Sequence, residues 1–197
     1  CSYYYGDEGG RYLEIDNKCN RDVFLAGNQQ PETKQVLIYE MLKAGGVNTC
    51  LIGNIGIPVF EKADEGDDLV AVVEMSSHQL EFTKASPHVA VLVNIYQEHL
   101  DHYKTGYEGY VGAKLNIALH QKKDDVLIYN PEQDLTGVVD WKKVIKGTPK
   151  PVTFTAAAED EFINELWKST EHLKGEHNRQ DIAYALAAAR VFGVSDD

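Results

Sequence analysis

Three residue types suited to metal-assisted phosphate chemistry stand at separate places along this chain. Glu74 follows one apolar run, His99 lies in a polar segment after another, and Lys114 lies within a helical pattern. A carboxylate is a common Mg²⁺ ligand, an imidazole can ligate a metal, and a lysine amine can bind phosphate. A neutral lysine amine could also take up CO₂ and become an anionic metal ligand. The three residues together predict a metal-assisted phosphate site.

Further polar groups stand beside the first of these residues. Ser76, Ser77 and Gln79 follow Glu74 closely and offer two hydroxyls and an amide, which suit a polar substrate. The same stretch also fits a capped turn that leads into a helix. Asn54, between two glycines, is a weaker candidate of the same kind.

The segment around His99 allows a second metal reading. His99 and His102 have a spacing that could suit zinc, whereas a single His99 ligand held by a neighbouring carboxylate suits a different metal. No cysteine lies nearby, which favours the reading without zinc.

Composition narrows the class of protein. The 197 residues are 43% hydrophobic and carry a net charge of -12, which allows one substantial core and argues against a nucleic-acid partner. No apolar run approaches the roughly 20 residues that span a bilayer, so we expect no membrane association. The three cysteines, Cys1, Cys19 and Cys50, form no CxxC pair and favour a reducing cytoplasm.

Apolar runs alternate with helical patterns along the chain. Nearly continuous apolar runs are typical of parallel strands that helices cover on both faces. The sequence therefore predicts an α/β fold with an open, mostly parallel sheet and helices on both faces. The expected strands are 23–26, 48–52, 69–73, 89–93, 126–129 and 152–154, and the expected helices are 34–44, 107–120 and 181–192, with an amphipathic stretch at 159–167.

Ligands of such sheets lie beyond the carboxyl ends of the strands. Residues that directly follow the apolar runs therefore carry most weight, although Gly and Asn are also ordinary turn formers. These residues are Gly27, Gly53–Asn54, Glu74, Asn94 and Asn130.

Six blocks of this sequence resemble, in order, the central domain of Mur ligases. The likeness is greatest to the members that add D-glutamate to UDP-N-acetylmuramoyl-L-alanine. The blocks are GNIG (53–56), EMSSHQLE (74–81), NIYQEHLDHY (94–103), GAKLNI (112–117), YNPEQD (129–134) and KGEHNRQDIAYALAAA (174–189).

The resemblance implies ATP, Mg²⁺, a UDP-muramoyl substrate and an incoming amino acid, D-glutamate by the greatest likeness. It implies that Glu74 holds the Mg²⁺ shared with the ATP phosphates, that His99 binds a second Mg²⁺, and that Lys114 is carbamylated and positions that metal. It further implies ATP contacts at Gly27, Thr33 and Asn178, and substrate contacts at Asn54, Ser76, Ser77 and Gln79.

The phosphate loop departs from the family pattern. Members carry Gly-Thr-x-Gly-Lys-Ser/Thr-Thr, whereas this chain has GNQQPET at 27–33, in which only Gly27 and Thr33 match. Pro31 stands at the lysine position and lacks an N–H, and Glu32 would repel a phosphate 4 Å away by roughly 4 kcal/mol at an effective dielectric near 20. A bridging Mg²⁺ could use Glu32 as a ligand and recover part of this. We expect weak ATP binding.

The resemblance places residues 1–20 in an N-terminal extension and 21–197 in the central ATP-binding domain, without the flanking UDP-binding and C-terminal domains. It therefore predicts an ATP-dependent amide ligase module that is inactive alone. The alternative is a non-catalytic or redesigned domain of this fold that has lost ATP binding. A Rossmann-like oxidoreductase is disfavoured because no GxGxxG follows a strand. The sequence does not indicate an oligomeric state.

Overall fold

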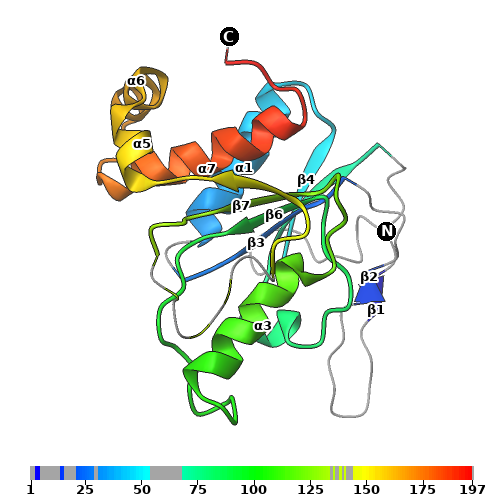
Figure 1. Cartoon of the computed structure of the whole chain (residues 1–197). Coiled ribbons are helices and arrows are strands. Elements are labelled where there is room, and N and C mark those ends of the chain that lie inside the picture. Colours follow the sequence, from blue (N-terminus) through cyan, green and yellow to red (C-terminus); the bar gives the residue numbers. More distant parts are fainter. Residues whose placement is uncertain are drawn as a thin grey trace.

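A six-stranded parallel sheet forms the centre of the molecule. The computed structural model describes residues 3–4, 14–15, 21–28, 31–53, 68–133, 135, 138, 140 and 144–196. The strands lie in the order β4-β5-β3-β6-β7-β8, and each neighbouring pair is parallel. The α/β fold with an open parallel sheet is therefore confirmed (Figure 1). The strands are β3 (Val23–Ala26), β4 (Thr49–Gly53), β5 (Val70–Glu74), β6 (Val89–Leu92), β7 (Val126–Tyr129) and β8 (Thr148–Pro151).

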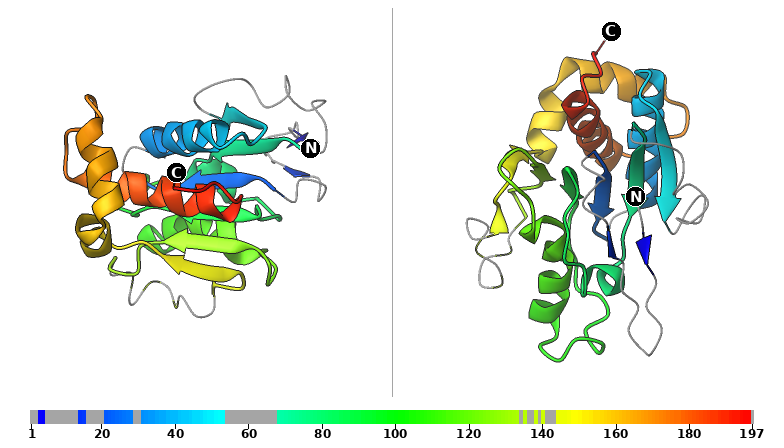
Figure 2. Two further views of the ribbon diagram at one scale, coloured as in Figure 1. Left: turned by 90° about the horizontal axis from the view of Figure 1, so that it is seen from above. Right: turned by 90° about the vertical axis from the view of Figure 1, so that its right-hand side faces the viewer.

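Helices cover both faces of this sheet, as the continuous apolar strands predict. Figure 1 shows α1 and α7 on one face and α3 on the other, and the views of Figure 2 agree. A small antiparallel pair, β1 (Tyr3–Tyr4) and β2 (Glu14–Ile15), is separate from the sheet. The helices are α1 (Pro31–Ala44), α2 (Ser77–Leu80), α3 (Tyr107–Leu119), α5 (Phe154–Glu159), α6 (Glu161–Ser169) and α7 (His177–Val191).

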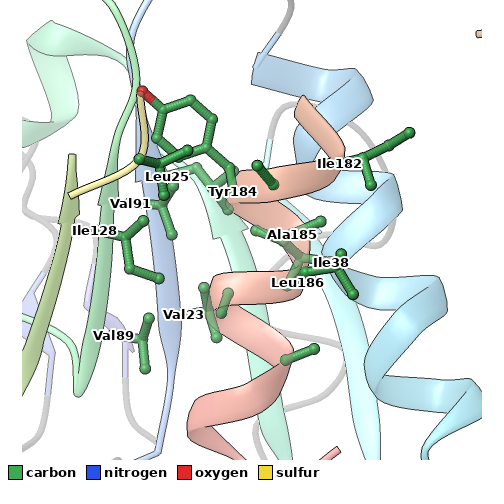
Figure 3. Packing of buried hydrophobic residues seen from close by; sticks show 14 of the residues in the cluster. Val23, Leu25, Ile38, Val89, Val91, Ile128, Ile182, Tyr184, Ala185 and Leu186 are labelled. Atoms are coloured by element: carbon green, nitrogen blue, oxygen red, sulfur yellow. The ribbon is translucent and has the colours of Figure 1, made fainter. Parts of the chain in front are cut away.

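Alternation along each strand divides the core into two clusters. Val23 and Leu25 of β3 face α1 and α7, whereas Phe24 and Ala26 of the same strand face α3. Figure 3 shows the first cluster, in which Tyr184, Ala185 and Leu186 of α7 and Ile38 of α1 pack over the valines of β3 and β6. Burying these side chains on both faces fixes where each strand ends, and so positions the residues that follow.

Helix ends differ slightly from the expected bounds. α1 begins at Pro31, three residues earlier than predicted, because proline suits the first position of a helix, where its missing N–H has no partner to lose. α7 begins at His177, four residues earlier than predicted. Its first turn is polar and so carried no apolar period in the sequence. The predicted stop at Gly193 is confirmed by its left-handed φ of 80°.

The predicted strand at 152–154 is wrong. The last strand is instead β8 (Thr148–Pro151), whose two prolines are tolerated because it lies at the sheet edge. Thr153 then caps α5 by accepting a hydrogen bond from the backbone N–H of Ala156 at 3.0 Å. The predicted amphipathic stretch at 159–167 corresponds largely to α6. The N-cap residue of α6, Asp160, accepts a hydrogen bond from the backbone N–H of Ile163 at 3.0 Å.

None of the helices in the described parts of the chain combines the length and the apolar composition needed to cross a membrane.

Candidate functional site

The strand registers bring the predicted strand-end residues to one edge of the sheet. Leu25 pairs with Glu74, and Ala26 pairs with Leu92, so Gly27, Glu74 and the residues after β6 lie at the same carboxyl edge. The sequence prediction that this edge gathers polar groups therefore agrees with the topology.

Lys114 reaches this edge from inside the protein. Although it lies on a helix, its side chain is buried, and its Nζ donates a hydrogen bond to the backbone carbonyl of Gly27 at 3.0 Å. Burial lowers the pKa of Lys114 below its usual value, while the carboxylates of Glu74 and Glu98 act in the opposite direction. A buried amine with a lowered pKa loses its proton more readily, which is what uptake of CO₂ requires.

Close packing explains why glycine occupies position 27. A Cβ on Gly27 would lie 1.8 Å from Cγ2 of Val93, and its φ of 157° is one that other residues rarely adopt. The next residue is also held: the backbone N–H of Asn28 donates to the carbonyl of Asn94 at 3.0 Å. The start of the loop is thus fixed by the end of β6.

Asn28 connects three segments, a role that the sequence did not reveal. Its side chain accepts a hydrogen bond from the backbone N–H of Tyr96 at 2.9 Å, and its Nδ2 lies 2.8 Å from the hydroxyl of Tyr110 on α3. Burial raises the pKa of Tyr110 to about 12, so this hydroxyl stays protonated. The Tyr110 ring also lies beneath the Lys114 ammonium, at 5.6 Å from Nζ to the ring centre.

Glu74 is buried at the end of β5, directly before a capping box. Ser76 Oγ accepts from the N–H of Gln79 at 3.2 Å, and Gln79 Oε1 accepts from the N–H of Ser76 at 2.8 Å. Ser77 is buried within α2. The capped-turn reading therefore describes this segment, and substrate contacts at these three residues stay predictions.

His99 lies in an exposed loop with a left-handed φ of 51°. Its ring centre is 5.2 Å from that of His78, while the ring of His102 is 4.3 Å from His78. The histidine that contacts a carboxylate is His102, whose Nε2 lies 3.1 Å from Glu81 Oε2.

Among the described residues, no three His, Cys, Asp or Glu side chains are placed to hold a metal together. The predicted Mg²⁺ donors stay a prediction: a buried carboxylate at Glu74, an imidazole at His99 and an amine at Lys114. Their chemistry would suit the ion if the amine became an anionic carbamate and phosphate oxygens added further ligands.

A polar pocket of about 450 Å³ opens beyond β6 and β7. Asn130 Nδ2 donates to Asn94 Oδ1 at 2.8 Å, and the Gln133 side chain accepts from the N–H of Ile95 at 2.9 Å. Asn94 and Asn130 were strand-end candidates, whereas Gln133 lies within the YNPEQD block but was not predicted as a site residue. The lining residues are Asn94, Ile95, Tyr96, Gln97, Tyr107, Asn130, Glu132 and Gln133.

Two predicted ATP contacts lie on the sheet face that α1 and α7 cover, one on each of these adjoining helices. Thr33 is partly buried in the first turn of α1, and Asn178 is buried in the first turn of α7. A buried ion pair links the helices, because Lys34 Nζ lies 2.8 Å from Asp181 Oδ1. Neither member of the pair was predicted. Thr33 also lines an apolar groove of about 580 Å³ with Val36, Leu37 and residues 170–173.

Some predicted positions lie outside the described residues. They are Asn54, and Gln29 and Gln30 of the loop; the side chains of Pro31 and Glu32 are likewise not described.

The Mur ligase middle domain model matches residues 33–189 of this chain. Two similar proteins are both named UDP-N-acetylmuramoylalanine–D-glutamate ligase. That of Clostridium botulinum (strain Loch Maree / Type A3) is 38% identical over 136 residues, 66% of this chain and 30% of the relative. That of Geobacillus kaustophilus (strain HTA426) is 35% identical over 186 residues, 88% of this chain and 41% of the relative.

A relative of the same name from Streptococcus pyogenes serotype M5 (strain Manfredo) is 32% identical over 187 residues, 88% of this chain and 40% of the relative. The chain thus spans between 30% and 41% of the length of these proteins. A solved structure of a UDP-N-acetylmuramoyl-L-alanyl-D-glutamate–2,6-diaminopimelate ligase has the same fold, with a TM-score of 0.65 and 17% identity over 89% of this chain and 44% of that one.

Proposed function

The chain belongs to the Mur ligase middle-domain family, and we propose that it is the ATP-dependent module of a ligase that extends peptidoglycan precursors. The observation that carries the proposal is the buried Lys114, whose Nζ donates a hydrogen bond to the backbone carbonyl of Gly27 and whose pKa is influenced by the nearby carboxylate of Glu74. A lysine kept at this edge has a clear use in phosphoryl transfer and little value to the core, because burying an amine costs free energy.

The proposed reaction is formation of an amide bond through an acyl phosphate. The substrate carboxylate attacks the γ-phosphorus of ATP and ADP leaves; the amino group of the incoming amino acid then attacks the acyl carbon and phosphate leaves. Glu74 and His99 would each hold a Mg²⁺, and these cations would neutralise charge on the phosphoryl oxygens. Lys114, after adding CO₂ and losing a proton, would supply an anionic ligand.

Residues on the two faces of the sheet would hold the two different ligands, the nucleotide and the UDP-muramoyl substrate. Gly27 and Thr33 lie at the two ends of the loop, and Asn178 would contact the adenine. On the opposite face, Ser76, Ser77 and Gln79 would contact the UDP-muramoyl substrate. Asn54, which lies outside the described residues, is proposed as a further contact of that substrate. The relatives named for D-glutamate support D-glutamate as the incoming amino acid.

The remaining parts of the proposal follow the family. Residues 1–20 would form an extension and 21–197 the central domain, which acts with UDP-binding and amino-acid-binding domains. The isolated chain would then be inactive, and the cysteine pattern fits a cytoplasmic enzyme.

A non-catalytic role is the second candidate, and the start of α1 favours it. A phosphate loop uses its backbone N–H groups to hold phosphate, but here the helix starts at Pro31, which has none. A domain with this loop could keep the fold for binding or assembly without hydrolysing ATP.

Calorimetric titration of Mg²⁺-ATP, with ADP as a second ligand, separates the two candidates. The ligase module predicts binding that Glu74→Ala abolishes and that Glu108→Ala, at an exposed acid on α3, leaves unchanged. Absence of binding at millimolar ATP in the parent chain would reject nucleotide binding through this loop as it stands and favour the non-catalytic role.

A further inference from the structure

Two buried charged residues that the proposed reaction leaves unused join α1 to α7. Lys34 Nζ lies 2.8 Å from Asp181 Oδ1, and the side chains are only 4% and 5% exposed. Thr33 and Asn178, the predicted ATP contacts on these two helices, lie beside the pair in sequence. The ion pair is therefore a near neighbour in sequence of two residues of the predicted nucleotide site.

Stability alone explains this pair poorly. A buried ion pair gives little net stabilisation, because desolvation of both charges offsets their attraction. The second carboxylate oxygen, Asp181 Oδ2, is buried and has no hydrogen-bond partner among the described residues. Burial raises the pKa of Asp181, and the nearby Lys34 ammonium counteracts this only in part. The carboxylate thus holds the lysine through one oxygen while its other oxygen stays unsatisfied.

Both members of the pair lie near the start of their helices, α1 and α7. α1 follows β3 directly, and Gln180 Nε2 of α7 donates to the carbonyl of Val152, just beyond β8, at 3.4 Å. Both helices therefore begin at the carboxyl edge of the sheet. Helical side chains point back toward the helix N-terminus and cover residues three or four positions earlier.

This general direction favours an approach of the Lys34 side chain toward the first turn of α1. Lys34 lies three residues after Pro31, and position 31 is where the family's phosphate loop carries its lysine. The Lys34 side chain, which starts one helical turn further along the chain, can thus deliver an ammonium to the first turn of α1.

We propose that Lys34 is the phosphate-binding cation of this chain, in place of the lysine that the loop lacks, and that Asp181 holds its ammonium when no nucleotide is bound. This inference rests on the proposed function, because it requires that a nucleotide binds here. The β- and γ-phosphates of the nucleotide would draw the ammonium away from Asp181.

Charge makes this exchange favourable. A triphosphate carries several negative charges, whereas Asp181 offers one, and the ammonium interacts more strongly with the larger charge. Lys34 and Lys114 are the two buried basic side chains of the described chain. If Lys114 becomes an anionic carbamate, Lys34 is the cation that remains to offset the phosphates.

Two single substitutions should change phosphate affinity in opposite directions. Lys34→Gln removes the cation and should weaken binding about tenfold or more, the usual scale for a charge-assisted hydrogen bond. Asp181→Asn removes the competing carboxylate and should strengthen binding. Lys43→Gln, near the other end of the same helix, should leave affinity unchanged. Calorimetry with Mg²⁺-ATP and with magnesium tripolyphosphate, which has no base, measures the phosphate contribution alone.

A purely structural ion pair predicts a different pattern. Both single variants would then lower stability to urea and shift affinity in the same direction. Lys34→Arg keeps the charge and should keep binding, whereas the neutral double variant K34Q/D181N avoids an unpaired buried charge and should bind as weakly as Lys34→Gln. Equal affinities of Lys34→Gln and Lys43→Gln, or equal weakening by both single variants, would overturn the inference.

The same titrations separate this inference from the proposed function. Glu74-dependent binding by the parent chain, with unchanged affinity in Lys34→Gln, would overturn only the role of Lys34. Absence of binding by the parent but binding by Asp181→Asn would support it. Absence of binding by both would overturn the lysine role and nucleotide binding together.

Discussion

At the scale of single residues, Lys114 shows how burial can change what a side chain does. An exposed lysine on α3 would stay charged at neutral pH, but burial lowers the pKa of Lys114 toward a range in which more of the neutral amine is present. Only the neutral amine reacts with CO₂. Carbamate formation at Lys114 should therefore persist to lower pH than at an exposed lysine.

Carbon-13 NMR with labelled bicarbonate measures this carbamate directly. We expect a carbamate signal at neutral pH that Lys114→Ala removes and that Lys104→Ala, at an exposed position, retains. Lys114→Ala should also abolish any Mg²⁺-dependent activity of the full ligase, and a short carboxylic acid should restore part of it. Full activity of the alanine variant would exclude the carbamate role.

Gly27 provides a second prediction at this scale. Gly27→Ala places a methyl group 1.8 Å from Cγ2 of Val93, so we expect a loss of stability of about 1–3 kcal/mol, typical of overpacking. Urea unfolding measures the loss. Because Val93→Ala removes the clashing methyl groups, the double variant should lose less stability than the sum of the two single variants. Simple additivity would place the strain of Gly27→Ala in its backbone.

At the scale of elements, the loop and the helix that follows it determine nucleotide binding. Replacing Gln30-Pro31-Glu32 by Gly-Lys-Ser supplies a lysine and one further backbone N–H, and it removes the carboxylate of Glu32. Mg²⁺-ATP should then bind more tightly, as calorimetry can measure, and Lys34→Gln should matter less in this background than in the parent. Unchanged affinity would indicate that the nucleotide binds elsewhere or does not bind.

The positions of helices and strands were predictable where their burial produces an apolar pattern in the sequence. The runs of Val, Leu and Ile identified five of the six strands of the sheet, because strands covered on both faces are apolar throughout. β8 was not predicted because its side chains are largely exposed and form no apolar run, and its sequence TPKP resembles a loop. The first turn of α7 escaped because its residues are polar.

At the scale of the whole molecule, the site could be predicted only where a strand or a family block marked it. Glu74, Asn94 and Asn130 follow strands, so topology alone gathers them at one edge. The contact of Lys114 with Gly27 depends on which face of α3 meets the sheet. Lys34 and Asp181 are far apart in sequence, and the residues around each of them do not indicate that the two side chains pair.

The division of the core between two faces also affects the order in which this chain can fold during synthesis. The cluster under α3 draws its buried side chains from residues up to Val144, so it can close while the last part of the chain is still being made. The opposite cluster needs Ala185 and Leu186 of α7 to cover Leu25. A nascent chain that has not reached α7 therefore presents one apolar side of its sheet that α1 covers only in part. Such an exposed apolar surface is one that a ribosome-associated chaperone would recognise.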